Sequence, residues 1–96
     1  MKPSEIIGHK REEIRSIVAA HRARNPRVFG SAMRRTDRND SDLDLLIDPL
    51  PGATLLDLGA IQYALESSLG IAVDVVTPGD LPVRFRQKVV AEATPI

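Results

Sequence analysis

Two aspartates separated by one leucine, Asp42-Leu43-Asp44, are the residues best suited to chemistry in this 96-residue chain. They open an apolar run that predicts a strand over 42–48, and successive side chains of a strand point to opposite faces. Asp42 and Asp44 are therefore expected on one face and Leu43 on the other. Two like charges placed so close together repel each other. A hard divalent cation with oxygen ligands would relieve the repulsion, which makes a divalent-cation site the first hypothesis.

A Gly30-Ser31 pair stands upstream of these aspartates. A turn at this pair, continued as a short helical turn over 31–35, would present backbone N–H groups and a serine hydroxyl to an anion such as phosphate. Gly30 lets the backbone approach a ligand closely. Arg34 and Arg35 could add positive charge, because arginine can engage phosphate with two hydrogen bonds. Alone, such a pair is more often an ordinary turn, so its weight comes from the aspartates that follow.

A third aspartate, Asp74, interrupts the apolar run 71–76, which predicts a strand that is buried on both faces. A buried ionised carboxylate without a partner costs several kcal/mol, so Asp74 would need a metal, a cation or a raised pKa. From residue chemistry alone two readings stay open. The three aspartates hold a metal, or the first two are solvated acids at a strand entrance and Asp74 pairs with an arginine such as Arg34 or Arg84.

Composition predicts one folded domain over residues 1–96, with 43% hydrophobic residues and three aromatic ones. The chain has no cysteine, which excludes disulfides and thiolate metal sites. No apolar run approaches the roughly 20 residues that span a bilayer, and the N-terminus lacks the apolar core of a signal peptide. We therefore expect no membrane association and a cytoplasmic location.

Charge is unevenly distributed although the net charge is zero. Residues 1–38 carry ten Lys/Arg and four Asp/Glu, a balance of +6, whereas residues 39–96 carry three and nine, a balance of −6. Such asymmetry can indicate a site for a polyanion or an acidic partner face, or simply a solvated basic helix. Zero net charge and few aromatic residues argue against a dedicated nucleic-acid binder.

Periodicity predicts an α/β (α+β) protein in which helices pack on a small mixed sheet. The strand over 42–48 is followed by a helix and then the strand over 71–76, which suits a parallel crossover. The strand over 27–29 reaches 42–48 without a long helix, so that pair is expected to be antiparallel. Helices are predicted over 4–24, over 55–69 with Thr54 as N-cap and Gly70 as the stop, and over 82–92, and the tail 94–96 is expected to be frayed.

The motifs Gly30-Ser31 and Ser41-Asp42-Leu43-Asp44, followed by Asp74, together resemble the nucleotidyltransferase signature of the DNA polymerase beta superfamily. The resemblance covers roughly the whole chain and is strongest to the minimal nucleotidyltransferases that act as antitoxins of HEPN toxins. It implies the nucleotidyltransferase fold, a mixed sheet of three to four strands with about four helices. One departure is Arg35, since relatives often carry glycine after the preceding arginine.

The resemblance also implies a reaction and a set of site residues. Asp42, Asp44 and Asp74 would be catalytic and would hold two Mg²⁺ ions, and the nucleotide would be bound by Gly30, Ser31, Arg34 and Ser41. The implied activity is transfer of AMP from ATP to a hydroxyl group, with tyrosine the expected acceptor, on a HEPN toxin that forms a hetero-oligomer with the chain. ATP is favoured over other triphosphates by resemblance alone. The chain is expected to lack an acceptor-binding domain of its own.

A non-catalytic antitoxin that neutralises the toxin by direct binding is the alternative, with the aspartates as relics. Asp48 shares the strand face of Asp42 and Asp44 and is interpreted as a solvated strand end, because Pro49 follows it.

Overall fold

Four strands form one mixed sheet on which the helices lie. The computed structural model describes residues 1–96. The strand order is β3-β2-β1-β4, with β1 antiparallel to β2 and to β4, and β2 parallel to β3. These pairings confirm the predicted antiparallel and parallel connections. The elements are α1 (Pro3–Ala20), β1 (Ala23–Phe29), α2 (Gly30–Arg34), β2 (Leu43–Pro49), α3 (Leu55–Leu69), β3 (Val73–Val76), the 3₁₀ turn η1 (Pro78–Asp80), α4 (Val83–Glu92) and β4 (Thr94–Pro95).

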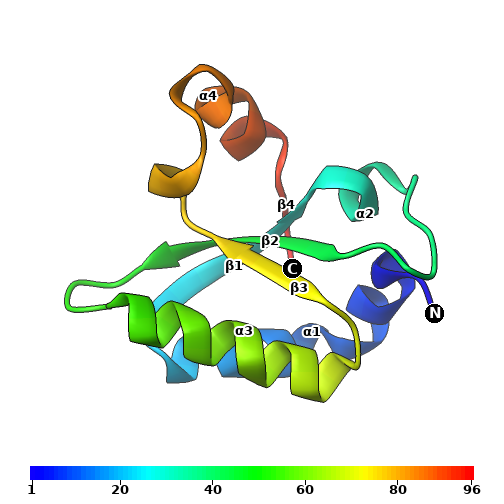
Figure 1. The fold of residues 1–96 in the computed structure, drawn as a ribbon, viewed down its shortest axis with the longest axis horizontal. Coiled ribbons are helices and arrows are strands. Elements are labelled where there is room, and N and C mark those ends of the chain that lie inside the picture. The colour runs from blue at the N-terminus through cyan, green and yellow to red at the C-terminus, as the bar shows by residue number, and fades with distance from the viewer.

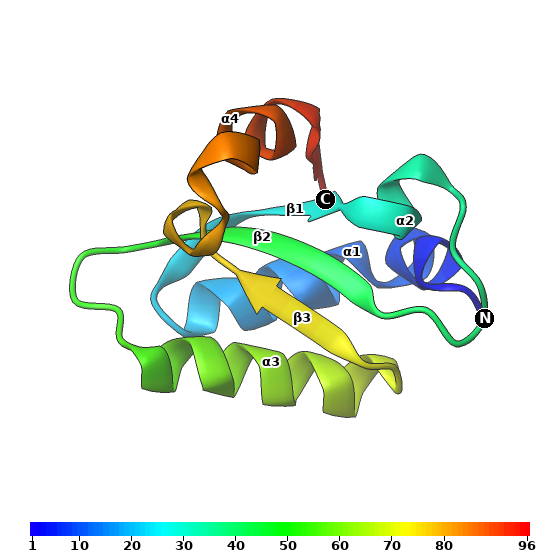
Figure 2. The same ribbon diagram turned by 45° about the horizontal axis from the view of Figure 1, so that its top comes forward.

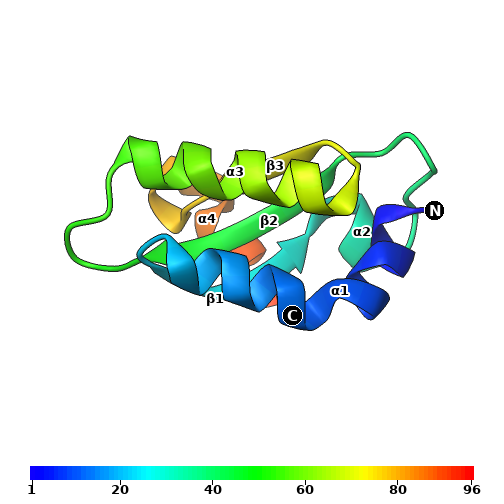
Figure 3. The same cartoon turned by 90° about the horizontal axis from the view of Figure 1, so that it is seen from below.

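Helices lie on both faces of this sheet but cover them unequally. The long helices α1 and α3 lie side by side across one face (Figure 3). The other face carries α2 at one end and α4 nearer the other, and the segment that leads from α4 into β4 descends between them (Figure 1). None of the four helices combines the length and the apolar character that crossing a bilayer requires. The predicted architecture of a small mixed sheet with about four helices is confirmed.

The hydrophobic core lies between the sheet and the pair α1 and α3. Leu43, Leu45 and Ile47 are fully buried and belong to one core cluster, as strand alternation predicts. The helices contribute residues at helical spacing to the same cluster, namely Ile6, Ile7, Ile14, Val18, Ile61, Leu65 and Leu69. The opposite face of β2 carries Asp44 and Asp48, so the sheet separates the core from the acidic face.

Helix α3 begins and ends where the sequence predicts. The Thr54 hydroxyl accepts a hydrogen bond from the Leu56 N–H at 3.2 Å, and the Asp57 carboxylate accepts one from the Thr54 N–H at 2.9 Å. This reciprocal cap satisfies N–H groups that a helix start leaves free. Gly70 ends the helix with φ +72°, the left-handed conformation that glycine adopts readily. Helical spacing in the sequence predicts a buried stripe of Leu55, Leu58, Ile61, Leu65 and Leu69 on this helix. The prediction is wrong for Leu55, whose side chain is 83% exposed in the first turn.

The predicted boundary between the first helix and the first strand was also wrong. Helix α1 ends at Ala20 instead of residue 24, and β1 already begins at Ala23 instead of residue 27. Arg22, with φ 59°, lies between the helix and the strand where the chain turns, whereas Asn25, with φ 58°, lies inside β1. The β1–β2 register shifts between Arg24 and Arg27, so the strand accommodates Pro26 at an irregularity.

Two predictions about the C-terminal half need correction. Strand β3 is an edge strand, so it is not buried on both faces, and Asp74 is exposed on its outer face. The tail is not frayed, because β4 pairs with β1 and Ile96 is 6% exposed in the core. The Arg15 Nε atom donates a hydrogen bond of 2.8 Å to the Ile96 carbonyl, which fixes the last residue against α1.

Candidate functional site

The three predicted aspartates meet at the ends of two neighbouring strands. Asp44 of β2 and Asp74 of β3 are register partners in the parallel pair, so their side chains leave the same face of the sheet. Asp42 lies two residues before Asp44, directly before β2 begins. Figure 2 shows β3 at the open edge of the sheet beside β2. The topology therefore brings together three carboxylates that are separated by up to 32 residues in the sequence.

Gly30 lies directly against one of these carboxylates. Phe29 pairs with Asp44 across the antiparallel strands, so the next residue turns over the Asp44 side chain. A Cβ atom added at Gly30 would lie 2.2 Å from Asp44 Oδ2, and Gly30 has φ +71°. Both the space and the backbone conformation thus require glycine at this position. The predicted Gly-Ser turn therefore lies against the second aspartate of the predicted pair.

The electrostatic setting of Asp44 disfavours its negative charge. Burial raises the pKa of this half-buried carboxyl above its ordinary value of 3.8, and the charges of Asp74 and Asp42 raise it further. The positive charge of Arg34 acts in the opposite direction but does not cancel these effects. Concentrated negative charge on one face is therefore a physical property of this site, and it favours binding of a cation.

The carboxylate oxygens of Asp42, Asp44 and Asp74 are chemically suited to bind a hard divalent cation. Carboxylate oxygens are the ligands that Mg²⁺ prefers, and it completes its shell with water and phosphate oxygens. The three carboxylates do not form a closed cage in the folded chain, where no group of three His, Cys, Asp or Glu residues is arranged to hold a metal alone. Asp74 also forms no ion pair with Arg34 or Arg84, which removes that alternative explanation of its charge.

Helix α2 follows the turn at Gly30-Ser31 and carries Arg34 in its last turn. Arg34 is exposed, and its charge acts on Asp44. Arg35 caps the helix with φ 57° and ψ 34°, the left-handed conformation that glycine adopts without strain. The chain therefore keeps the turn expected of a glycine although it carries a bulky cation at this position.

Replacing Arg35 should reveal that strain. Arg35→Gly should raise the free energy of unfolding by about 0.5 kcal/mol, because relief of roughly 1–2 kcal/mol of left-handed strain exceeds the roughly 1 kcal/mol that glycine adds to unfolded-chain entropy. Arg35→Val should lower it by at least about 1 kcal/mol, since β-branched residues fit this conformation poorly. Urea denaturation measures both variants, and equal stabilities would contradict the assigned backbone conformation.

Ser41, predicted to bind nucleotide, has a local role in the loop before β2. Its hydroxyl oxygen accepts a hydrogen bond of 2.8 Å from the Arg38 N–H, and its own N–H donates to the Arg38 carbonyl at 3.1 Å. These bonds close a tight turn just before Asp42. The O–H hydrogen of Ser41 remains available as a donor.

Asp48 is not the solvated strand end that the sequence predicts. Its carboxylate accepts hydrogen bonds from Arg27 at 2.5 Å and from Asn25 at 3.0 Å, and Arg27 is only 8% exposed. Arg27 also donates from Nε to the Asn25 carbonyl at 3.1 Å. Arg27 and Asp48 lie on the face of the sheet that carries Asp44, and their ion pair neutralises the acidic strand end away from the three aspartates.

This ion pair predicts loss of stability in acid. Burial opposes ionisation of Asp48, but the hydrogen bond from Asn25 and the charge of Arg27 outweigh it and lower the pKa of Asp48 below 3.8. Because the pKa of Asp48 is lower in the folded than in the unfolded protein, Asp48 stabilises the fold at a pH above its unfolded-state pKa. That stability is lost as the pH falls through its folded-state pKa. The melting temperature should therefore fall below about pH 4, and in Asp48→Asn this fall should be smaller. If the melting temperature of Asp48→Asn fell in acid as much as that of the wild type, the Arg27–Asp48 ion pair would not be the cause.

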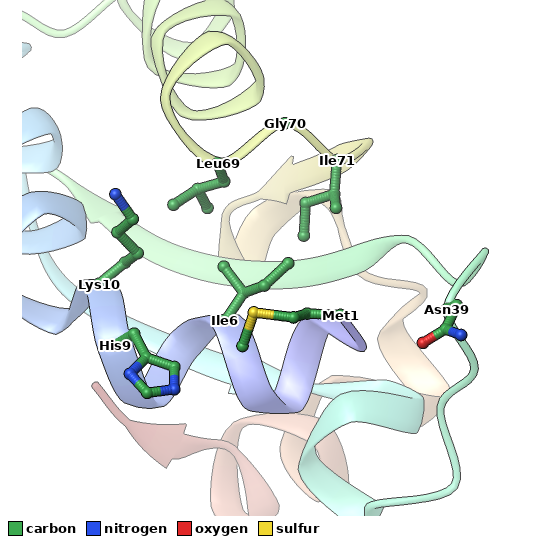
Figure 4. Close-up of a pocket in the computed structure, with 8 residues that line it drawn as sticks. All are labelled: Met1, Ile6, His9, Lys10, Asn39, Leu69, Gly70 and Ile71. Atoms are coloured by element: carbon green, nitrogen blue, oxygen red, sulfur yellow. The ribbon is translucent and has the colours of Figure 1, made fainter.

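The candidate site is an open surface. None of the three hollows of the molecule is lined by any of the seven predicted site residues. The hollow drawn in Figure 4, of about 400 Å³, lies between the start of α1 and the end of α3, where Met1 and Ile6 lie on one side and Leu69 and Ile71 on the other. Asp42 and Asp74 are instead exposed and Asp44 is half-buried, so a large acceptor has access to the three aspartates.

Comparison with known proteins gives consistent results. The family model described as "Polymerase beta, Nucleotidyltransferase" matches residues 12–96. A protein adenylyltransferase of Thermococcus cleftensis, MntA, is 35% identical over 89 residues, which span 84% of this chain and 90% of MntA.

Two solved structures resemble the chain in fold. A structure described as a candidate minimal nucleotidyltransferase has a TM-score of 0.87 and 44% identity, over 97% of this chain and 95% of the other. A toxin–antitoxin structure with AMP-PNP has a TM-score of 0.73 over 88% of this chain and 69% of the other, and its 20% identity supports likeness of fold alone.

Proposed function

Because the chain belongs to the polymerase beta nucleotidyltransferase family, we propose that it transfers AMP from ATP to a hydroxyl group of a partner protein. The observation that carries this proposal is the juxtaposition of Asp44 and Asp74 as register partners, with Asp42 beside them and Gly30 turned over the Asp44 carboxylate. Acidic side chains next to a glycine turn provide both a place for cations and a close backbone approach for phosphate.

Each residue has a role in the proposed reaction. Gly30 and Ser31 hold the outer phosphates through backbone N–H groups and the serine hydroxyl, and Arg34 adds positive charge at the end of the same short helix. Asp42, Asp44 and Asp74 are the proposed ligands of two Mg²⁺ ions. When bound there, Mg²⁺ would offset the charge of the phosphates and lower the pKa of the attacking hydroxyl.

The proposed reaction is an in-line displacement. The acceptor oxygen forms a bond to the α-phosphorus while the bond from that phosphorus to the bridging oxygen breaks, and pyrophosphate leaves. Asp74 is exposed on the edge strand and accepts the proton of the acceptor hydroxyl. The nucleotide then remains on the acceptor as an AMP ester.

We propose a toxin of the HEPN family as the acceptor, modified on a tyrosine, in a hetero-oligomer with this chain. Support comes from the relative named as a protein adenylyltransferase and from the fold shared with a toxin–antitoxin structure solved with AMP-PNP. Asp42 and Asp74 are exposed, which leaves room for a protein surface to approach the proposed site. The chain would then act as an antitoxin by modifying the toxin.

Cell growth distinguishes catalysis from the alternative, neutralisation by binding alone. The partner toxin is expressed with either the wild-type chain or the Asp42→Asn/Asp44→Asn variant, both at equal measured levels. Catalysis predicts that the wild type restores growth and the variant does not. Full protection by the variant would contradict the catalytic proposal and favour the binding antitoxin. Asp57→Asn is the matched control, since Asp57 caps α3 away from the site.

A further inference from the structure

The segment 36–42 joins the two halves of the candidate site. It leaves α2, which carries the Gly30-Ser31 turn, and it delivers Asp42 to the start of β2. In the middle of this segment Asp37 is only 5% exposed, which makes it the one buried acidic residue of the chain. No step of the proposed reaction uses it.

Both carboxylate oxygens of Asp37 are bound by one residue of α1. Oδ2 accepts a hydrogen bond of 2.8 Å from the Ser4 N–H, and Oδ1 accepts one of 2.9 Å from the Ser4 hydroxyl. Ser4 lies in the first turn of α1, where N–H groups lack partners inside the helix and the helix dipole favours negative charge. Burial opposes ionisation of Asp37, but the bonds from Ser4 outweigh it and lower the pKa of this carboxyl below 3.8.

The other hydrogen bonds of the segment are local. The Thr36 N–H donates to the Ser31 carbonyl at 3.0 Å, and the Arg38 N–H donates to the Ser41 hydroxyl at 2.8 Å. The two bonds of Asp37 are the only hydrogen bonds that fasten the segment to a long helix. Helix α1 is itself anchored in the core through Ile6 and Ile7, which follow Ser4 within one turn.

We propose that the Asp37–Ser4 pair is a positioning clamp, which holds the 36–42 segment on α1 so that Asp42 and the Gly30-Ser31 turn keep their relative placement during nucleotide transfer. This inference rests on the proposed function for its effect on catalysis. The clamp touches no reacting atom and acts through the residues that it positions. A displacement of about 1 Å at such a site is enough to cost on the order of a hundredfold in rate.

A graded series of variants tests the clamp. Asp37→Ala removes both bonds and should lower kcat roughly tenfold while it changes the KM for MgATP less than about threefold. Asp37→Asn and Ser4→Ala each weaken or remove one bond and should have intermediate effects. Ser4→Thr keeps the N–H and the hydroxyl and should retain wild-type kcat. The double variant Ser4→Ala/Asp37→Ala should be no slower than Asp37→Ala, because the two residues act as a unit.

Thr54→Ala is the matched control for a general loss of stability. It removes the N-cap of α3, a comparable helix-start interaction on a helix that forms no hydrogen bond with the 36–42 segment. The clamp predicts an unchanged kcat in Thr54→Ala although its melting temperature falls about as much as that of Asp37→Ala. Equal losses of kcat in the two variants would overturn the positioning role.

Amide hydrogen exchange separates failure of the clamp from failure of the proposed function. In Asp37→Ala, residues 36–42 should exchange at least about tenfold faster, while the β2 amides stay protected as in the wild type. This comparison needs no turnover, so it decides the clamp even if no acceptor is ever labelled. Unchanged exchange over 36–42 would overturn the inference. If wild-type and Asp37→Ala enzymes transfer AMP equally well, the clamp is likewise wrong and the proposed function stands.

Discussion

Gly30→Ala should abolish nucleotide transfer and destabilise the fold. The new Cβ would lie 2.2 Å from Asp44 Oδ2, so the carboxylate or the turn must move. The backbone φ of +71° adds strain for any residue with a side chain. We expect the free energy of unfolding to fall by about 2–4 kcal/mol and the transfer rate to fall at least about a hundredfold.

Two other glycines separate the sources of this effect. Gly70→Ala has the same positive φ, 72°, with no atom within 4 Å, so it should lose only about 1–2 kcal/mol from backbone strain. Gly59→Ala lies inside α3 with open space around it and should gain up to about 1 kcal/mol. Urea denaturation of the three variants gives the order of their free energies of unfolding. Gly30→Ala as stable as Gly70→Ala would mean that no close approach to Asp44 exists.

Asp44→Asn should remove activity and make the protein more stable. The isosteric amide cannot supply the second negative oxygen that the proposed metal site needs, and we expect about a thousandfold loss in rate. The same change removes a half-buried charge that Asp74 and Asp42 repel. The melting temperature of the metal-free protein at neutral pH should therefore rise by about 2–4 °C.

The pH dependence of this variant gives a second, independent check. A raised pKa means that the folded state holds its proton more tightly, so the contribution of Asp44 to stability falls as the pH rises from the unfolded value through the folded one. The rise in melting temperature caused by Asp44→Asn should therefore be present at pH 7 and vanish below about pH 4. Asp48→Asn is the control, because it should change the melting temperature at pH 7 in the opposite direction and lower it. A destabilised Asp44→Asn protein would contradict the electrostatic account of the site.

Strand alternation alone predicted which side chains of β2 enter the core and which lie on the face of the candidate site. Leu43, Leu45 and Ile47 lie in the core and Asp44 points away from it, as a two-residue period requires. The parallel pairing of β2 with β3 followed from the helical connection between them, and it placed Asp74 beside Asp44. These features were accessible because they depend on local periodicity and on the length of a connection.

The errors arose where distant contacts override local pattern. Asp37 lies 33 residues from Ser4, and nothing near either residue indicates that they meet. The Arg27–Asp48 pair was in principle accessible, since antiparallel neighbours on one face of adjacent strands can pair, but the following Pro49 suggested an exposed end. Ile96 looked like part of a frayed tail because a two-residue strand has no periodicity to detect.

Transfer of label from α-labelled ATP to protein shows whether the three aspartates catalyse nucleotide transfer. The chain is incubated with Mg²⁺, labelled ATP and lysate of its own source organism that contains the partner protein, and the products are resolved on a denaturing gel. Catalysis by these aspartates predicts a labelled protein band with the wild-type chain and none with the folded Asp42→Asn/Asp44→Asn variant. No band with the wild type, or an equal band with the variant, would contradict transfer by these aspartates.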